Sequence, residues 1–341
     1  MNVEQLLETA AAMVAPGRGI LAIDESTGTI TKRLDSVGVE CTEANRRNYR
    51  DMLLTTADLG EHISGAILFD ETLRQEGNSG VAFVDIMQEA GIIPGIKVDK
   101  GAHPMAGFDG ELVTEGLDGL RERLNEYAEL GARFAKWRAV ITIDEENGMP
   151  SQANIDANCH ALARYAALCQ EAGIVPMVEP EVIMTGTHDI DTAYDVTELT
   201  LKTLFTHLYE HDVLLEGTIL KSSMVVPGDK CPEQASVEDV AEATVSCLMN
   251  AVPASLAGVV FLSGGQSEVE ATEHLNEMNN LGPMPWPLSF SYGRALQASA
   301  LKVWGANPKD NIAAAQAELS HRARMNGFAT LGEYNAKMEA S

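Results

Sequence analysis

Eight short apolar runs recur along the chain, and each is followed by a loop and then by an amphipathic, helix-period segment. Runs with apolar residues at successive positions are typical of parallel strands that are buried on both faces. The runs are GILAID (19–24), ISGAILF (63–69), IIPGIKV (92–98), FAKWRAV (134–140), IVPMVEPE (174–181), LLEGTILK (214–221), GVVFLSGG (258–265) and LSFSYGR (288–294).

The segments between these runs predict helices over residues 117–130, 156–172, 192–211 and 237–251. Two helix starts carry the capping-box pattern, Ser236 with Asp239 and Ser267 with Glu270. Repeated alternation of strand and helix, without a long linker, predicts an α/β fold with a single (β/α)8 TIM barrel over residues 1–341. We expect extra helices at about 3–13 and about 309–325, and a loosely held tail at about 327–341. A doubly wound open sheet is the alternative, but no G-x-G-x-x-G follows the first run.

The charge balance excludes some classes of partner. The 341 residues include 50 acidic and 24 basic side chains, a formal net charge of −26. Nucleic acids and anionic membranes need a cationic face, so neither is expected to bind. Five cysteines without a C-x-x-C pair fit reduced thiols, and no secretory signal or membrane-length apolar run is visible. We therefore expect a soluble, cytoplasmic protein.

Charged and small polar residues stand where the apolar runs end. The carboxyl ends of barrel strands form the active-site face, and charged groups are costly to bury unless they are paired. The residues at these ends are Asp24, Lys97, Lys136, Arg138, Glu179, Glu181, Lys221, Ser263, Gly264, Gly265 and Arg294. The set predicts a functional site at one mouth of the barrel.

Lys221 is the candidate nucleophile, because a partly desolvated amine at the end of a buried strand can attack a carbonyl. Lys136 would face the same mouth, and a neighbouring cation favours the neutral form of an amine. A Schiff base formed on such a lysine is an electron sink that lets an adjacent bond break or form. Glu179 is placed to shuttle protons during imine formation, and Asp24 to take a hydroxyl proton as a carbon–carbon bond cleaves.

Two phosphate-binding regions flank this lysine. Small residues with free backbone N–H groups and a bidentate arginine form the first, and hydroxyls and cations form the second. The first contains Ser263, Gly264, Gly265 and Arg294; the second contains Ser26, Thr29, Lys32 and Arg33 of ESTGTITKR (25–33), with Lys97 nearby. Their placement on opposite sides of the lysine predicts a substrate with a phosphate at each end.

Over nearly the whole chain the sequence resembles the class I fructose-1,6-bisphosphate aldolases. The matching strings are GILAIDESTGTITKR (19–33), GIKVDKG (95–101), FAKWR (134–138), ARYAALCQEAGIVPMVEPE (163–181), LEGTILK (215–221), FLSGGQSE (261–268) and SFSYGRALQASALK (289–302). The resemblance implies reversible cleavage of fructose 1,6-bisphosphate to dihydroxyacetone phosphate and glyceraldehyde 3-phosphate, without a metal or cofactor. Phosphorylated ketoses and trioses would be the substrates, in glycolysis or gluconeogenesis, with the Calvin cycle left open. It also implies a homotetramer.

The same resemblance implies roles for single residues. Lys221 matches the Schiff-base lysine, Glu179 the proton-transfer residue of imine formation, and Asp24 the carboxylate at the carbon–carbon bond. Lys136 and Arg138 lie beside Asp24, and Glu181 matches a further active-site carboxylate. The phosphate next to the ketone is matched by Ser263, Gly264, Gly265, Gly293 and Arg294, and the other phosphate by Ser26, Thr29 and Lys97, with Lys32 and Arg33 in support.

One departure concerns the end of the chain. Animal members of this family end in a mobile tail whose final tyrosine assists a proton transfer, whereas the last tyrosine here is Tyr334. Tail-assisted proton exchange, and the relative activity on mono- and bisphosphate sugars, are therefore left open.

Other classes of function compete with an imine-forming aldolase. A metal-dependent aldolase would need a histidine and carboxylate site, but His207 and His211 lie mid-helix, where a solvated or packed pair is expected. A non-catalytic sugar-phosphate-binding or scaffolding protein on the same fold would usually lack a catalytic residue, and none is lost. The paired phosphate regions argue against a transaldolase.

Overall fold

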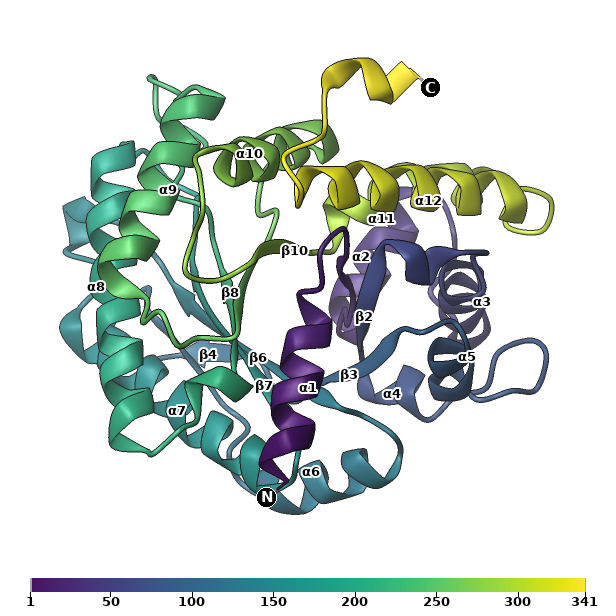
Figure 1. Cartoon of the computed structure of the whole chain (residues 1–341), viewed down its shortest axis with the longest axis horizontal. Coiled ribbons are helices and arrows are strands. Elements are labelled where there is room, and N and C mark those ends of the chain that lie inside the picture. Colours follow the sequence, from purple (N-terminus) through teal and green to yellow (C-terminus); the bar gives the residue numbers. More distant parts are fainter. Residues whose placement is uncertain (1, 341) are drawn as a thin grey trace.

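The structure is a closed barrel of parallel strands wrapped by helices (Figure 1). It is a computed structural model that describes residues 2–340. Around the barrel the strand order is β1-β10-β9-β8-β7-β6-β3-β2. These strands are β1 (Gly19–Ile23), β2 (Ile63–Leu68), β3 (Ile93–Lys97), β6 (Phe134–Ile141), β7 (Val175–Val182), β8 (Ile219–Ser222), β9 (Gly258–Phe261) and β10 (Leu288–Tyr292). The predicted TIM barrel is confirmed.

Helices follow the strands and pack their apolar faces on the outside of the barrel. Those described are α1 (Val3–Met13), α2 (Thr27–Ser36), α3 (Glu43–Leu54), α4 (Asp70–Leu73), α5 (Phe83–Glu89), α6 (Leu120–Glu129), α7 (Gln152–Glu171), α8 (Ile190–Glu210), α9 (Val237–Ala251), α10 (Glu268–Asn280), α11 (Arg294–Ala306) and α12 (Ile312–Ala329). Short 3-10 turns lie at Leu59–Glu61, Glu145–Asn147, Leu215–Gly217 and Ala336–Ala340. Both predicted capping boxes are present, at the starts of α9 and α10.

The strand predicted over 214–221 is wrong in its first half. Leu215–Gly217 is a 3-10 turn, and β8 begins only at Ile219. Gln170 of α7 explains this, because its side-chain amide donates to the Leu214 carbonyl at 2.8 Å and its Oε1 accepts from the Leu214 N–H at 3.0 Å. Backbone groups that a neighbouring strand would otherwise bind are thereby satisfied. An apolar run alone does not reveal such a side-chain partner.

Two further elements differ from the expectation. A small antiparallel hairpin, β4 (Ala102–Pro104) and β5 (Leu112–Thr114), was not predicted, since its strands are short and partly polar. Helix α12 runs to Ala329, beyond the predicted end at about 325 and past the predicted start of the tail. Tyr334 is buried and its hydroxyl donates to Glu339, which also accepts from Arg322 of α12. A loosely held tail remains a prediction about mobility.

The barrel interior has two layers of different character. A lower layer is apolar and is covered by α1; it comprises Leu6, Ala10, Met13, Val14, Ile20, Ala22, Ile67, Phe134, Val175, Met177, Ile219 and Val260. An upper layer comprises Asp24, Lys97, Lys136, Glu179 and Lys221. Four of these stand two residues beyond a lower-layer residue on the same strand, so the alternation of strand side chains points both sets inward.

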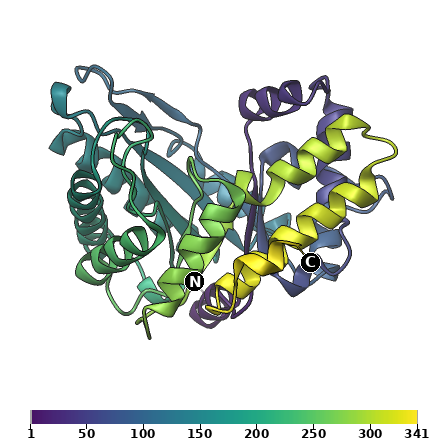
Figure 2. The same cartoon turned by 90° about the horizontal axis from the view of Figure 1, so that it is seen from above.

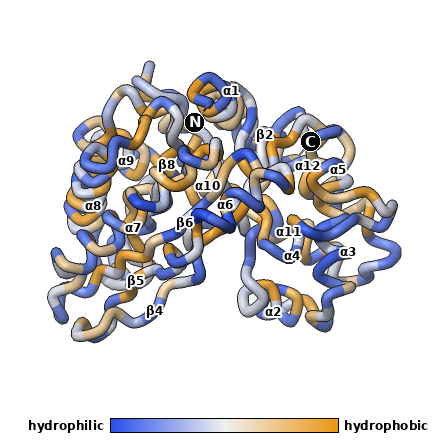
Figure 3. The backbone as a smooth tube through the Cα atoms, turned by 90° about the horizontal axis from the view of Figure 1, so that it is seen from below, coloured by the Kyte–Doolittle hydropathy of each residue, from blue (hydrophilic) through white to orange (hydrophobic). Residues whose placement is uncertain are grey.

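The two ends of the barrel are closed differently. Helix α1 lies across one end, and α2 and the β4–β5 hairpin lie at the opposite end (Figure 3). Seen from above, both described termini lie away from the end that carries α2 (Figure 2). The carboxyl ends of the strands, with the upper layer, therefore open on the side of α2.

Candidate active site

A cavity of about 1110 Å³ occupies the open mouth of the barrel. Except for Gly265, every residue that the sequence nominated lines it. These are Asp24, Ser26, Thr29, Lys32, Arg33, Lys97, Lys136, Arg138, Glu179, Glu181, Lys221, Ser263, Gly264, Gly293 and Arg294. Residues from strand ends far apart in the chain thus meet in one place.

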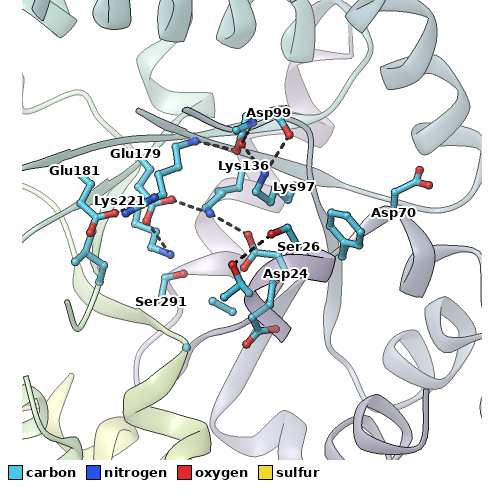
Figure 4. Close-up of a pocket in the computed structure, with 18 of the residues that line it drawn as sticks. Asp24, Ser26, Asp70, Lys97, Asp99, Lys136, Glu179, Glu181, Lys221 and Ser291 are labelled. Atoms are coloured by element: carbon cyan, nitrogen blue, oxygen red, sulfur yellow. Dashed lines mark hydrogen bonds and ion pairs between the residues drawn. The ribbon is translucent and has the colours of Figure 1, made fainter. Parts of the chain in front are cut away.

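Lys136 stands at the centre of the cavity. Its Nζ lies 2.9 Å from Asp24 Oδ2 and 3.0 Å from Glu179 Oε2 (Figure 4). The other oxygen of Glu179 lies 3.1 Å from Lys221 Nζ. All four side chains are nearly inaccessible, so two lysines and two carboxylates form one buried, alternating chain of charges.

The ion pairs among these buried side chains decide their protonation states. Burial alone would raise the pKa of Asp24, but the charges of Lys136 and Lys221 outweigh it and hold the pKa well below its ordinary value. The same balance lowers the pKa of Glu179. Burial would lower the pKa of Lys136, yet Asp24 and Glu179 raise it above its usual range. Lys136 is therefore a fixed cation, and both carboxylates are bases at neutral pH.

The first predicted phosphate region is built at the ends of β9 and β10. Ser263 and Gly264 follow β9, and α11 begins at Arg294 immediately after Gly293. Gly265 does not line the cavity. Its φ is +71°, and an added Cβ would lie 1.7 Å from Met184 Sδ, so this glycine is required by its turn and by close packing.

The second predicted region lies at the start of α2. Ser26 is the N-cap residue, and its Oγ lies 3.3 Å from Thr29 Oγ1. No side chain caps the start of this helix, and Ser26 and Thr29 line the cavity. Lys97 is anchored nearby, with its Nζ 2.5 Å from Asp99 Oδ1.

Arg33 sits differently from its expected place. It bonds to Glu25, and its Nη2 lies 3.5 Å from the point where a Cβ on Gly293 would stand. It therefore lies next to Gly293 of the first region rather than only beside Ser26 and Thr29. Arg138 forms an ion pair with Glu181, and both residues line the cavity.

Similarity to known proteins identifies the family of this chain. The family described as fructose-bisphosphate aldolase class-I matches residues 5–341. The chain belongs to this family. A protein of Xylella fastidiosa strain 9a5c, named "Probable fructose-bisphosphate aldolase class 1", is 65% identical over 98% of this chain and 99% of its own length. Fructose-bisphosphate aldolase 1 of Toxoplasma gondii is 56% identical over 97% of this chain and 91% of its own.

The aldolase family likeness extends to three dimensions. A solved structure of fructose-bisphosphate aldolase from Plasmodium falciparum, in complex with TRAP and a small-molecule inhibitor, superimposes with a TM-score of 0.96. It is 50% identical in sequence, and the match covers 98% of this chain and 96% of that one. Class I aldolases are metal-independent lyases on a TIM barrel, as the sequence resemblance implied.

Sequence reasoning missed several residues of this aldolase site. Asp99, besides pairing with Lys97, accepts the Arg138 backbone N–H at 3.2 Å. Glu25 is buried between Arg33 and Arg50. Ser291 of β10 lines the cavity. Asp99 and Ser291 could have been found from the alternation of side chains along a strand, since each follows an inward-facing residue by two positions. The contacts of Glu25 join segments that no local sequence pattern connects.

The histidines lie elsewhere. His207 contacts Glu210, and its ring packs with His160, which also packs with His211. Within residues 2–340 no set of three histidine, cysteine or carboxylate side chains is grouped to hold a metal ion. Over the same residues no helix combines the length and the apolarity that a membrane crossing requires.

Proposed function

We propose that this chain cleaves fructose 1,6-bisphosphate reversibly into dihydroxyacetone phosphate and glyceraldehyde 3-phosphate through a Schiff base on Lys221. The observation that carries the proposal is the buried series of ion pairs Lys221–Glu179–Lys136–Asp24, with contacts of 2.9–3.1 Å. It lies inside a cavity that the residues of both predicted phosphate regions also line, except for Gly265. The family of the chain supports the same reaction.

Glu179 is the base and acid of imine formation. As Lys221 attacks the ketone, a C–N bond forms and one proton of its amine passes to the carbonyl oxygen, which becomes a hydroxyl. Glu179, 3.1 Å from Lys221 Nζ, takes the proton that Lys221 gives up on changing from ammonium to amine and then gives it to this hydroxyl, which leaves as water as the C=N bond forms. Lys136, kept charged by its two carboxylates, holds Glu179 ionised between steps.

Asp24 is the base for cleavage of the carbon–carbon bond. The protonated imine withdraws electrons from the neighbouring carbon, so the bond to the next carbon breaks when the hydroxyl there loses its proton. Asp24 is ionised and lies on the far side of Lys136 from Glu179, which suits it to accept that proton. Arg138 and Glu181 line the same wall and would orient the hydroxyls of the sugar.

The phosphates would be bound at the two ends of the cavity. We assign the phosphate next to the ketone to Ser263, Gly264, Gly293 and Arg294, and the other to Ser26, Thr29, Lys32 and Lys97, with Arg33 between them. On a protein with a net charge of −26 these are local concentrations of donors and cations. A homotetramer and a cytoplasmic location are further proposals; light scattering after gel filtration tests the first and cell fractionation the second.

Borohydride trapping tests the proposal directly. Dihydroxyacetone phosphate and borohydride, added in EDTA, should leave a reduced adduct on Lys221 that peptide mass spectrometry locates. The variant Lys221→Met is the matched control and should carry none, while Lys136 and Lys97 remain unmodified. Binding of the sugar phosphate by folded protein without any adduct would favour the non-catalytic, sugar-phosphate-binding alternative.

A further inference from the structure

Ser263 and Gly264, which we assign to the phosphate next to the ketone, belong to a tight turn between β9 and α10. The Gln266 N–H donates to the Ser263 carbonyl at 3.1 Å, and Gly265, with its φ of +71°, is the third residue of this turn. A positive φ at that position is typical of a type II turn. The directions of the backbone N–H groups at the phosphate region therefore depend on how this turn is held.

His274 of α10 binds the turn from the interior of the protein. Its side chain is 3% exposed, and its Nδ1 lies 2.7 Å from Oε1 of Gln266, the residue that closes the turn. Because an amide oxygen can only accept a hydrogen bond, Nδ1 carries the donated proton. Burial lowers the pKa of His274, although Glu270 opposes this shift, so the ring is neutral at neutral pH. The hydrogen bond thus fixes both the tautomer of His274 and the side chain of Gln266.

The contact between His274 and Gln266 serves the turn rather than the helix or the substrate. The start of α10 is already satisfied by its capping box. Neither His274 nor Gln266 is among the residues that line the cavity at the barrel mouth. On the other side of the turn, Gly265 packs so closely on Met184 that an added Cβ would lie 1.7 Å from its Sδ. The turn is therefore held between Met184 and His274.

We propose that His274 is a positioning residue that keeps the Ser263–Gln266 turn in the conformation that binds the substrate phosphate. This inference rests on the proposed function. His274 touches no substrate atom and transfers no proton; it fixes Gln266, so that less conformational freedom is lost when the phosphate binds. Without this hydrogen bond the phosphate should bind more weakly, whereas Lys221 should react as before once the substrate is bound.

Two substitutions of His274 separate this role from a contribution to stability alone. Leucine nearly preserves the buried volume but cannot donate, whereas asparagine is smaller but places its Nδ2 where Nδ1 of the histidine lies. We expect the dihydroxyacetone phosphate concentration for half-maximal borohydride trapping to rise about fivefold in His274→Leu and less than about twofold in His274→Asn. The maximal trapping rate should stay within about twofold of the wild type in both. The melting temperature should fall further in His274→Asn, because truncation leaves a cavity.

Unphosphorylated dihydroxyacetone is the matched control, because it can form the same imine without using the phosphate turn. Its trapping rate at a fixed concentration should be equal in the wild type and in His274→Leu. Gln266→Met removes the same hydrogen bond from the other side and should raise the half-saturating concentration of dihydroxyacetone phosphate by a similar factor. Combining Gln266→Met with His274→Leu should raise it no further, since the two changes remove one shared interaction.

Three results would overturn the role of His274. They are an unchanged half-saturating concentration in His274→Leu, an equal rise in His274→Asn, and an equal loss of reaction with dihydroxyacetone. Absence of any adduct in the wild type would instead remove the proposed function. The dissociation constant of dihydroxyacetone phosphate, measured by calorimetry, would then replace the half-saturating concentration, with the same order of variants expected and equal constants contradicting the inference.

Discussion

The lower and upper layers of the barrel interior are built by the same strands and have opposite energetics. The lower layer, with residues such as Phe134 and Ile219, is apolar and completely buried under α1. Two positions further along the same strands, Lys136 and Lys221 belong to a buried chain of charges. Apolar burial stabilises the fold, whereas buried ion pairs often contribute little net stability after desolvation. One end of the barrel therefore holds the molecule together, and the other is arranged for chemistry.

Of the variants considered, Lys221→Met should have the largest effect, and that effect should fall on activity rather than on stability. Activity should fall by roughly four orders of magnitude or more, because the nucleophile is lost. The free energy of unfolding should change little, since Glu179 keeps its pair with Lys136. Steady-state cleavage and urea unfolding of the same preparation measure both. Cleavage at above about one hundredth of the wild-type rate would contradict the assignment of Lys221.

Lys136→Met should damage the upper layer itself. Two buried carboxylates lose their shared cation, which we expect to lower the free energy of unfolding by about 3–5 kcal/mol at neutral pH. In the wild type the pKa values of Asp24 and Glu179 are lowered, so their stabilising contribution is complete above their unfolded pKa values and is lost as pH falls through the folded ones. The raised pKa of Lys136 acts oppositely: its contribution is complete below its unfolded pKa and is lost in strong alkali.

The pH dependence separates this effect from a packing defect. Without Lys136, burial dominates and raises the pKa of Asp24, so the variant is penalised most where that carboxyl must be ionised. The stability difference from the wild type should therefore shrink between about pH 8 and about pH 4.5, as measured by urea unfolding. A difference independent of pH would indicate lost packing rather than lost charge pairing.

Leu6→Ala probes the lower layer. Leu6 of α1 is buried in the lower layer, so its truncation should lower the free energy of unfolding by about 3 kcal/mol. The cleavage rate per folded molecule should not change, because the upper layer is untouched. Leu7 is the matched control: it is 38% exposed, and Leu7→Ala should cost less than about 0.5 kcal/mol. An activity loss in Leu6→Ala would show that the layers are coupled.

The smallest expected effects are changes in KM that distinguish the two predicted phosphate regions at the ends of the cavity. Arg294→Ala should raise KM about tenfold for both dihydroxyacetone phosphate and fructose 1,6-bisphosphate. Lys32→Ala should raise KM only for the bisphosphate, since Lys32 lies at the other end of the cavity. Initial-rate kinetics with the bisphosphate and adduct formation with the triose distinguish the two. The reverse pattern would exchange the two phosphate assignments.

Much of this arrangement could be predicted because periodicity reports which face of a strand a residue occupies. The run FAKWRAV identified β6, and the polar residues Lys136 and Arg138 within it indicated the site. Contacts between distant segments were not accessible in this way. Glu25, in the loop before α2, meets Arg50 of α3, Arg33 turns toward Gly293, and Gln170 binds the backbone at Leu214, where composition predicted the start of a strand. Side-chain rotation and long-range pairing decide such details, and neither has a local signature.

The position of α1 has a consequence for folding during synthesis. This helix leaves the ribosome first, but its apolar face packs against residues of β7, β8 and β9, and Val14 would collide with any Cβ on Gly258. These partners are made much later than Ile67 of β2, which belongs to the same layer, and the long loop between them and α1 must close before their contacts contribute. A nascent chain that has not reached Gly258 would leave α1 only partly covered, so chaperone contact and proteolysis should concentrate at the amino terminus until β9 is made.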